Sequence, residues 1–109
     1  MPIQVLLSQQ GPLPIKISFK APGDMPMYIE VNGSVWTQNA NTMTGIQIAI
    51  DGNNAGTANI FSNTPSTHRS VVPAYIPVKL DQNPHALSLT VLSGTISDSN
   101  DLYTAVIHY

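Results

Sequence analysis

The segment Ser66-Thr67-His68-Arg69 holds the side chains of this sequence that are best suited to bind a polar ligand. Arg69 is the only arginine in the chain, and its planar guanidinium can donate paired hydrogen bonds to neighbouring hydroxyls or to a carboxylate. The hydroxyls of Ser66 and Thr67 stand close by in the sequence. This combination favours a binding loop, although a lone arginine is also typical of an ion pair across a subunit boundary.

Metal binding and catalysis have less support in the sequence. His68, His85 and His108 are far apart and lack ligand spacing, so a metal site would need a symmetry axis that gathers copies of one histidine, with His108 the best candidate. The turn Asp98–Asp101 lacks the glycine and the distal glutamate of an EF-hand, and we expect it to cap its own backbone. Glu30 is the only glutamate, and no nucleophile or phosphate-loop motif occurs. We expect no metal, no cofactor and no enzyme activity, while a Ser–His–Asp set assembled by folding stays open.

The segment that precedes this loop is predicted to be a β-hairpin. Ile46, Ile48 and Ile50 alternate with small or polar residues, which is the period of a strand with one apolar face. Asp51–Asn54 supplies residue types that tolerate the positive φ of a hairpin turn. A return strand from Thr57 to Ser62 then leads into the polar loop. An antiparallel scaffold therefore presents the candidate binding residues.

Composition favours the same fold class for the whole chain. Charged residues make up only 9%, so the usual residues of exposed helix faces are scarce, while nine prolines and seven glycines interrupt the sequence. Turn signals recur at intervals of about 8–12 residues. We predict one all-β domain over residues 1–109, an eight-stranded antiparallel jelly-roll sandwich without significant helix. Its strands are expected at 3–8, 14–20, 27–37, 44–51, 55–62, 69–80, 86–94 and 102–109.

Three features carry more specific expectations. Pro73 and Pro77 place the segment 69–80 at a sheet edge or at a bulge, because proline cannot donate to a ladder. The segment 102–109 alternates to its last residue, and we expect it to pack centrally. Trp36 could stack on a sugar ring, but its place in an alternating strand favours a core position.

The hairpin and the loop resemble those of TNF/C1q-like trimeric jelly rolls, and in particular the TNF-like, fucose-binding N-terminal domains of the Burkholderia superlectin family. The resemblance rests on GIQIAI at residues 45–50 and on Ser66-Thr67-His68-Arg69, and it covers roughly residues 45–80. It implies a trimer whose partner is a glycan, fucosylated in that family. It also implies that Ser66, Thr67 and Arg69 contact the sugar.

The sequence departs from that family at two places. Gln47 stands where the family has a tyrosine, and Phe61-Ser62-Asn63 covers a second region that has tyrosine in the family. Gln47, Ser62 and Asn63 still carry groups that hydrogen-bond sugars. We therefore include these three residues, with Ser66, Thr67 and Arg69, in the predicted carbohydrate site.

Two functions from different classes follow. The first is a carbohydrate-binding lectin that acts as a homotrimer with shallow sites near subunit boundaries. The second is a structural or adhesive trimerising module of a phage-like or secreted appendage, with no small-molecule ligand. Both assume subunit contact, because segments such as 71–80 and 87–92 read as apolar on both faces. We expect Tyr103, Tyr109 or Trp36 near the trimer axis.

Charge and hydropathy limit the remaining partners. A net charge of −2 lacks the basic footprint of nucleic-acid binding. No apolar run approaches the roughly 20 residues of a membrane span. The N-terminus has no basic region of a signal peptide, and the chain has no cysteine. The compartment stays open between the cytoplasm and export without a cleaved signal.

Overall fold

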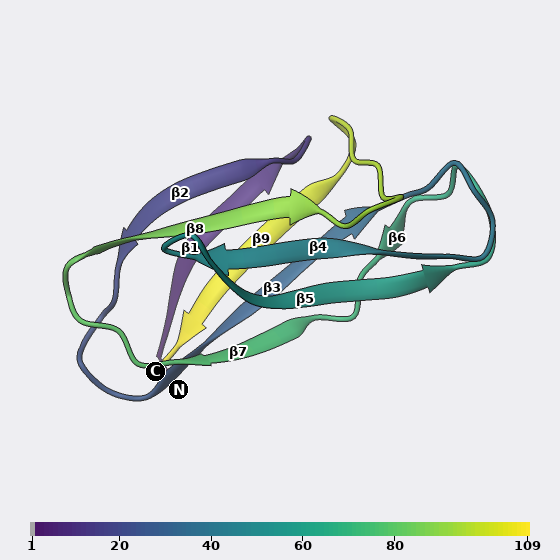
Figure 1. Ribbon diagram of the computed structural model, residues 1–109. Coiled ribbons are helices and arrows are strands. Elements are labelled where there is room, and N and C mark those ends of the chain that lie inside the picture. The colour runs from purple at the N-terminus through teal and green to yellow at the C-terminus, as the bar shows by residue number, and fades with distance from the viewer. Residues whose placement is uncertain (1) are drawn as a thin grey trace.

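The computed structural model describes residues 2–109, which form two antiparallel sheets packed as a sandwich (Figure 1). No helix occurs in these residues, and hence none that could cross a membrane. The all-β class predicted from composition is confirmed. The strands are β1 (Ile3–Gln10), β2 (Ile15–Lys20), β3 (Met27–Val35), β4 (Thr42–Ile50), β5 (Asn53–Ser62), β6 (Arg69–Ser70), β7 (Ala74–Val78), β8 (Pro84–Val91) and β9 (Leu102–His108).

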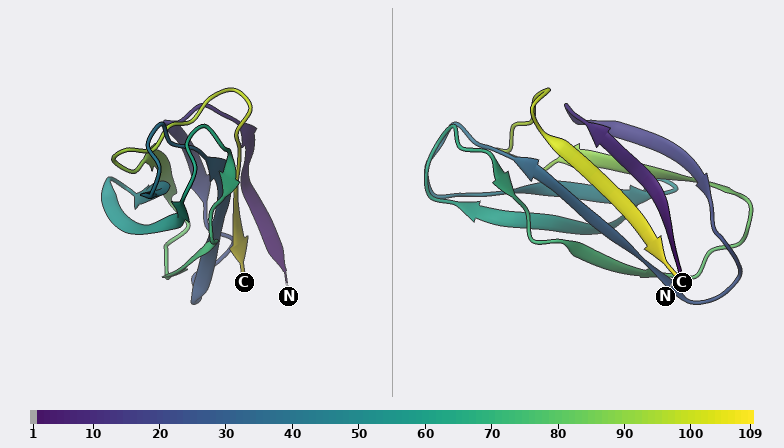
Figure 2. Two further views of the ribbon diagram at one scale, coloured as in Figure 1. Left: turned by 90° about the vertical axis from the view of Figure 1, so that its right-hand side faces the viewer. Right: turned by 180° about the vertical axis from the view of Figure 1, so that it is seen from behind.

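One sheet has the order β1-β9-β3-β6, with β7 also paired to β3, and the other has the order β2-β8-β4-β5. Figure 2 (right) looks onto the first sheet, with β9 between β1 and β3. This confirms the central place predicted for the C-terminal strand. We call the side of this sheet that faces away from β4 and β8 its outer face.

Strand alternation builds the core between the two sheets. Ile29 and Val31 of β3 face Ile46 and Ile48 of β4 across the sandwich, and all four are fully buried. Tyr103 of β9 is also fully buried within this single chain. Of the three aromatic residues expected near a trimer axis, Tyr103 is therefore not available, while Tyr109 and Trp36 are half-buried and stay predictions.

Pro73 divides the segment predicted as one strand at 69–80. β6 and β7 both pair with β3 on the side away from β9, so they form the edge of the first sheet. The edge position inferred from the prolines is confirmed, and the division accounts for the ninth strand. The argument for subunit contact also changes for segment 87–92, because Leu87 and Leu89 of β8 turn to one face and are buried within the chain itself.

The β4–β5 hairpin has the predicted turn. Asp51 and Gly52 connect the strands with φ of 51° and 80°, the pattern of a two-residue type I′ turn. The Asp51 carboxylate accepts hydrogen bonds from the backbone of Ala86 and from His85, at 2.8 and 2.7 Å. The hairpin is thus tied to β8 at its tip.

Candidate carbohydrate-binding face

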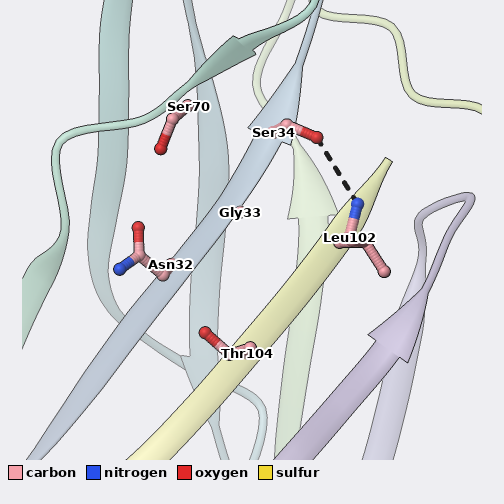
Figure 3. A pocket seen from close by; sticks show the side chains of 6 residues that line it. All are labelled: Asn32, Gly33, Ser34, Ser70, Leu102 and Thr104. Carbon is pink, nitrogen blue, oxygen red and sulfur yellow. Dashed lines mark hydrogen bonds between the residues drawn. The ribbon is translucent and has the colours of Figure 1, made fainter. Parts of the chain in front are cut away.

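The outer face of the first sheet carries a shallow cavity of about 350 Å³, which we call the polar depression. Directly opposite residues of paired strands share a face, and here Asn32 pairs with Thr104 and Ser34 with Ser70. Figure 3 shows these side chains around the depression. It is lined by Asn32, Gly33, Ser34, Ser70, Leu102 and Thr104.

The side chains of Asn32 and Thr104 make no hydrogen bond within residues 2–109. Ser34 is different, because its hydroxyl donates to Oδ1 of Asp101 at 2.8 Å and accepts the N–H of Leu102 at 3.4 Å. A hydroxyl has two acceptor lone pairs, so Ser34 is oriented and keeps one acceptor for a ligand. The depression therefore combines one oriented hydroxyl with an amide and a hydroxyl whose capacity is unused.

Gly33 forms the floor of the depression for a steric reason. A Cβ atom there would overlap the Tyr103 ring and lie 2.9 Å from Cδ1 of Ile46. The Tyr103 ring thus fills the space directly beneath the backbone, and burial raises the pKa of its hydroxyl to about 12. A buried aromatic ring therefore closes the floor, while the rim is polar.

A second group of polar residues lies beyond Ser34, and we call it the His68 cluster: His68, Asp98 and Asp101. Nδ1 of His68 lies 2.7 Å from Oδ1 of the fully buried Asp101, and its Nε2 lies 3.6 Å from Oδ2 of Asp98. The hydrogen bond with Asp101 is the main reason that the pKa of His68 is raised. Since Ser34 bonds to the same Asp101 oxygen, it joins this cluster to the polar depression.

The turn that carries the two aspartates caps its own backbone, as predicted. The N–H of Asn100 donates to Oδ1 of Asp98 at 2.8 Å, and the N–H of Asp98 donates to Oδ2 of Asp101 at 2.9 Å. Asp101 therefore accepts hydrogen bonds through both oxygens, from three different segments of the chain. Through these contacts, Asp101 holds the three segments together.

The His68 cluster does not have the arrangement of a catalytic triad. In a Ser–His–Asp triad the imidazole stands between the hydroxyl and the carboxylate. Here the carboxylate of Asp101 stands between Ser34 and His68, so the imidazole cannot take a proton from that hydroxyl. The cluster offers three ligand atoms within 4.8 Å of one another. The 2.7 Å contact between His68 and Asp101 has the length of a hydrogen bond.

Trp36 lies at this end of the sandwich rather than in the core favoured by its sequence pattern. It is half-buried, and its ring centroid is 5.8 Å from that of His68 with the planes at 38°. Its indole Nε1 is buried and has no hydrogen-bond partner within residues 2–109. Trp36 therefore supports the His68 ring from one side.

The other two histidines also contact carboxylates. His85 lies 2.7 Å from Asp51 and 3.0 Å from Asp81, and His108 lies 2.8 Å from Glu30. Chiefly because of its hydrogen bond with Asp51, the pKa of His85 is raised. These contacts give each histidine a role within the single chain.

The predicted loop residues Ser66 and Thr67 are exposed between β5 and β6. Ser66 has a φ of 60°, and its N–H donates to the carbonyl of Thr37 at 2.7 Å. The hydroxyl of Thr67 lies 3.3 Å from both Thr64 Oγ1 and the carbonyl of Pro65, which are long contacts for hydroxyl donors. The loop is therefore shaped by its own backbone, with both hydroxyls at the surface.

Arg69 projects to the other side of β6 from Ser70. It pairs with Val35, which is buried, while Ser70 pairs with Ser34 at the polar depression. Its Nε is buried without a hydrogen-bond partner, and it forms no ion pair within residues 2–109. An ion pair within residues 2–109 therefore does not fix the position of Arg69.

The structure separates Gln47 and Ser62 from the exposed loop residues Ser66 and Thr67. Gln47 is exposed on the opposite sheet, where it lines a second cavity of about 240 Å³ with residues such as Asn54 and Thr90. The Ser62 hydroxyl is buried 3.2 Å from that of Thr44, which removes it from any surface ligand. Asn63 is exposed directly after β5.

Comparison with solved structures finds two proteins with a similar fold. A family 35 carbohydrate binding module from Clostridium thermocellum has a TM-score of 0.54 and 12% identity, covering 95% of this chain and 90% of its own. The EclA C-terminal domain, a sugar-binding protein, has a TM-score of 0.52 and 10% identity, covering 99% of this chain and 79% of its own.

At these identities the similarity concerns the fold alone. The chain has the jelly-roll β-sandwich fold found in carbohydrate-binding modules. No protein-family model and no curated protein matches it. The TNF-like subclass stays a prediction.

Proposed function

We propose that the protein binds carbohydrate through the polar depression and acts as a binding module without catalysis. The observation that carries the proposal is the facing pair Asn32 and Thr104, whose polar groups are unused within residues 2–109. Amide and hydroxyl groups both donate and accept hydrogen bonds, as the hydroxyls of a sugar require. The fold shared with a carbohydrate-binding module supports this choice of ligand.

The depression suits a neutral ligand, which it would hold by directional hydrogen bonds rather than by charge. Its side chains come from three strands that are paired by backbone hydrogen bonds, so the backbone positions of these side chains are fixed before a ligand binds. Its shallow form limits the affinity of one site. Several copies in one assembly would compensate by avidity.

The loop residues Ser66, Thr67 and Arg69 form a secondary part of the proposal. Their support is the sequence resemblance, which also suggests a fucosylated glycan, together with the exposure of both hydroxyls. The loop ends one residue before Ser70, which lines the depression. We propose that these residues contact a part of the glycan that extends beyond the depression.

We further propose that the protein assembles as a homotrimer through the β1 side of the outer face. Ile3 and Val5 are 55% and 58% exposed; Val5 pairs with the half-buried Val106 of β9, and Ile3 pairs with His108. Such an apolar surface favours subunit contact and would place each polar depression near a boundary. The same surface is what favours the alternative function, a structural or adhesive trimerising module without a ligand.

A glycan array with matched variants tests the proposed site. Asn32→Ala and Thr104→Val should each lower the affinity for the bound glycans at least about tenfold, since a weak site depends on few hydrogen bonds. The control is Thr57→Val, a threonine exposed on a strand of the opposite sheet. Absence of binding to any glycan would support the structural module. Equal binding by all variants would exclude the polar depression.

A further inference from the structure

The outer face continues beyond the polar depression without a break. Along β3, residues two apart share a face, so Glu30 and Tyr28 follow Asn32 on the outer side. The strand rise places Glu30 about 7 Å from Asn32. Glu30 pairs with Tyr75 of β7, and their side chains therefore stand next to each other.

Tyr75 is an exposed aromatic ring with a fixed support. Its side chain is 59% exposed, and its ring meets that of Tyr28 edge-on, with centroids 5.8 Å apart. Tyr28 in turn stacks on His108 at 4.5 Å, with the planes 10° apart. His108 is held by a 2.8 Å contact with Glu30. We call Tyr28, Tyr75 and His108 the aromatic ledge.

The charge of this surface restricts the kind of ligand. Strands β1, β3, β7 and β9 contain no lysine or arginine, and Arg69 of β6 projects to the opposite side from Ser70. Glu30 is the acidic side chain between the polar depression and the aromatic ledge. A carboxylate accepts hydrogen bonds from sugar hydroxyls but repels a uronate or sialate. The surface therefore favours neutral sugars.

We propose that the outer face binds a linear neutral oligosaccharide along β3, with one unit in the polar depression and another stacked on Tyr75. The negative face of an aromatic ring attracts the C–H groups of a pyranose, while Glu30 accepts hydrogen bonds from its hydroxyls. This inference rests on the proposed function, and it adds the ligand class: a chain that spans both places, not a single sugar.

The test is calorimetric titration with linear neutral oligosaccharides of one to six units, from glucose, xylose, mannose and galactose series, with oligogalacturonates as the charged comparison. For at least one neutral series, affinity should rise about tenfold or more once the chain reaches both places. Tyr75→Ala should remove that rise, and Tyr75→Phe should retain it. Phe61→Ala, which removes an exposed ring on β5, is the matched control and should have no effect.

The outcomes separate this inference from the proposed function. If monosaccharides bind but affinity does not grow with length, the extended site is wrong while the polar depression stands. The same holds if Tyr75→Ala weakens every length equally or not at all. Tighter binding of oligogalacturonates than of neutral chains would overturn the neutral class. If no sugar of any length binds, the proposed function itself fails.

Discussion

Nδ1 of His68 lies 2.7 Å from Oδ1 of Asp101, and this contact ties the loop after β5 to the turn before β9. The same oxygen accepts the hydroxyl of Ser34, which reaches it from β3. Three segments that are distant in the sequence thus meet at one buried carboxylate. The end of the polar depression depends on this junction, since Ser34 lines it.

Asp101→Ala should therefore destabilise the fold strongly. The change leaves the partners of a fully buried carboxylate unsatisfied, and we expect a loss of about 3 kcal/mol in the free energy of unfolding. Urea denaturation followed by tryptophan fluorescence would measure it. Asp24→Ala, at an exposed loop position, is the control and should change stability little. A loss below about 1 kcal/mol for Asp101→Ala would contradict the junction.

Stability should fall as the pH rises above neutrality. The pKa values of His68 and His85 are raised, chiefly by hydrogen bonds with Asp101 and Asp51. A raised pKa in the folded state contributes stability that is complete below the ordinary value of 6.5 and is lost as the pH passes through the folded value. Urea unfolding between roughly pH 5.5 and 8.5, about three units that include the ordinary value, should show the decline. The double variant His68→Gln/His85→Gln should show a flatter profile, and an unchanged slope would refute the assignment.

At the acid end the direction reverses. The pKa values of Asp51 and Asp81 are lowered, chiefly by hydrogen bonds from the backbone of Ala86 and of Asn83. Their contribution is complete above the ordinary value of 3.8 and is lost as the pH falls through the lowered values. Asp51→Asn should therefore reduce the acid dependence of unfolding. An acid limb identical to that of the unmodified chain would count against it.

Arg69→Ala should weaken glycan binding less than Asn32→Ala does. Arg69 faces away from the depression and its Nε is buried, so its contribution is limited to ligand beyond the depression. We expect a loss of about threefold in affinity for Arg69→Ala, against tenfold or more for Asn32→Ala. Titration of both variants with the same glycan measures the ratio. The reverse order would move the main site to the Ser66–Arg69 loop.

Val5→Glu should disrupt the proposed trimer. A charge in the middle of an apolar contact is costly to bury, so the variant should sediment as a monomer in analytical ultracentrifugation. Val72→Glu is a matched control, because Val72 is 60% exposed but lies in the connection between β6 and β7. A monomeric unmodified protein at micromolar concentration would refute the trimer. Equal dissociation by both variants would refute its placement on β1.

Local patterns in the sequence were sufficient to predict most of the fold. Alternation at Ile46, Ile48 and Ile50 identified a buried strand, and Asp51-Gly52 identified its turn. Pro73 and Pro77 identified an edge. Alternation does not show which face of a strand turns inward when both faces are apolar. The strand of Leu87 and Leu89 is such a case. That choice depends on the partner sheet.

Much less of the candidate site than of the fold could be predicted from the sequence. Asn32 and Thr104 lie 72 positions apart in numbering, and only the pairing of β3 with β9 makes them neighbours. Each is a polar residue at an outward position of its strand, which is a signal shared with many solvated strand residues. By contrast, Ser62 looked available in a polar segment, yet its position at the end of β5 turns it into the sandwich. Strand pairing, rather than local composition, decides both cases.

The most direct test of carbohydrate binding at the polar depression is a nuclear magnetic resonance titration of the ¹⁵N-labelled protein with the glycan that binds best on the array. The account predicts that the backbone signals of Gly33 and Leu102 and the side-chain amide of Asn32 shift with one common saturation curve. The side-chain amides of Gln47 and Asn54, on the opposite sheet, should not move. Saturable shifts confined to Gln47 and Asn54, with none at Asn32, would contradict the central claim.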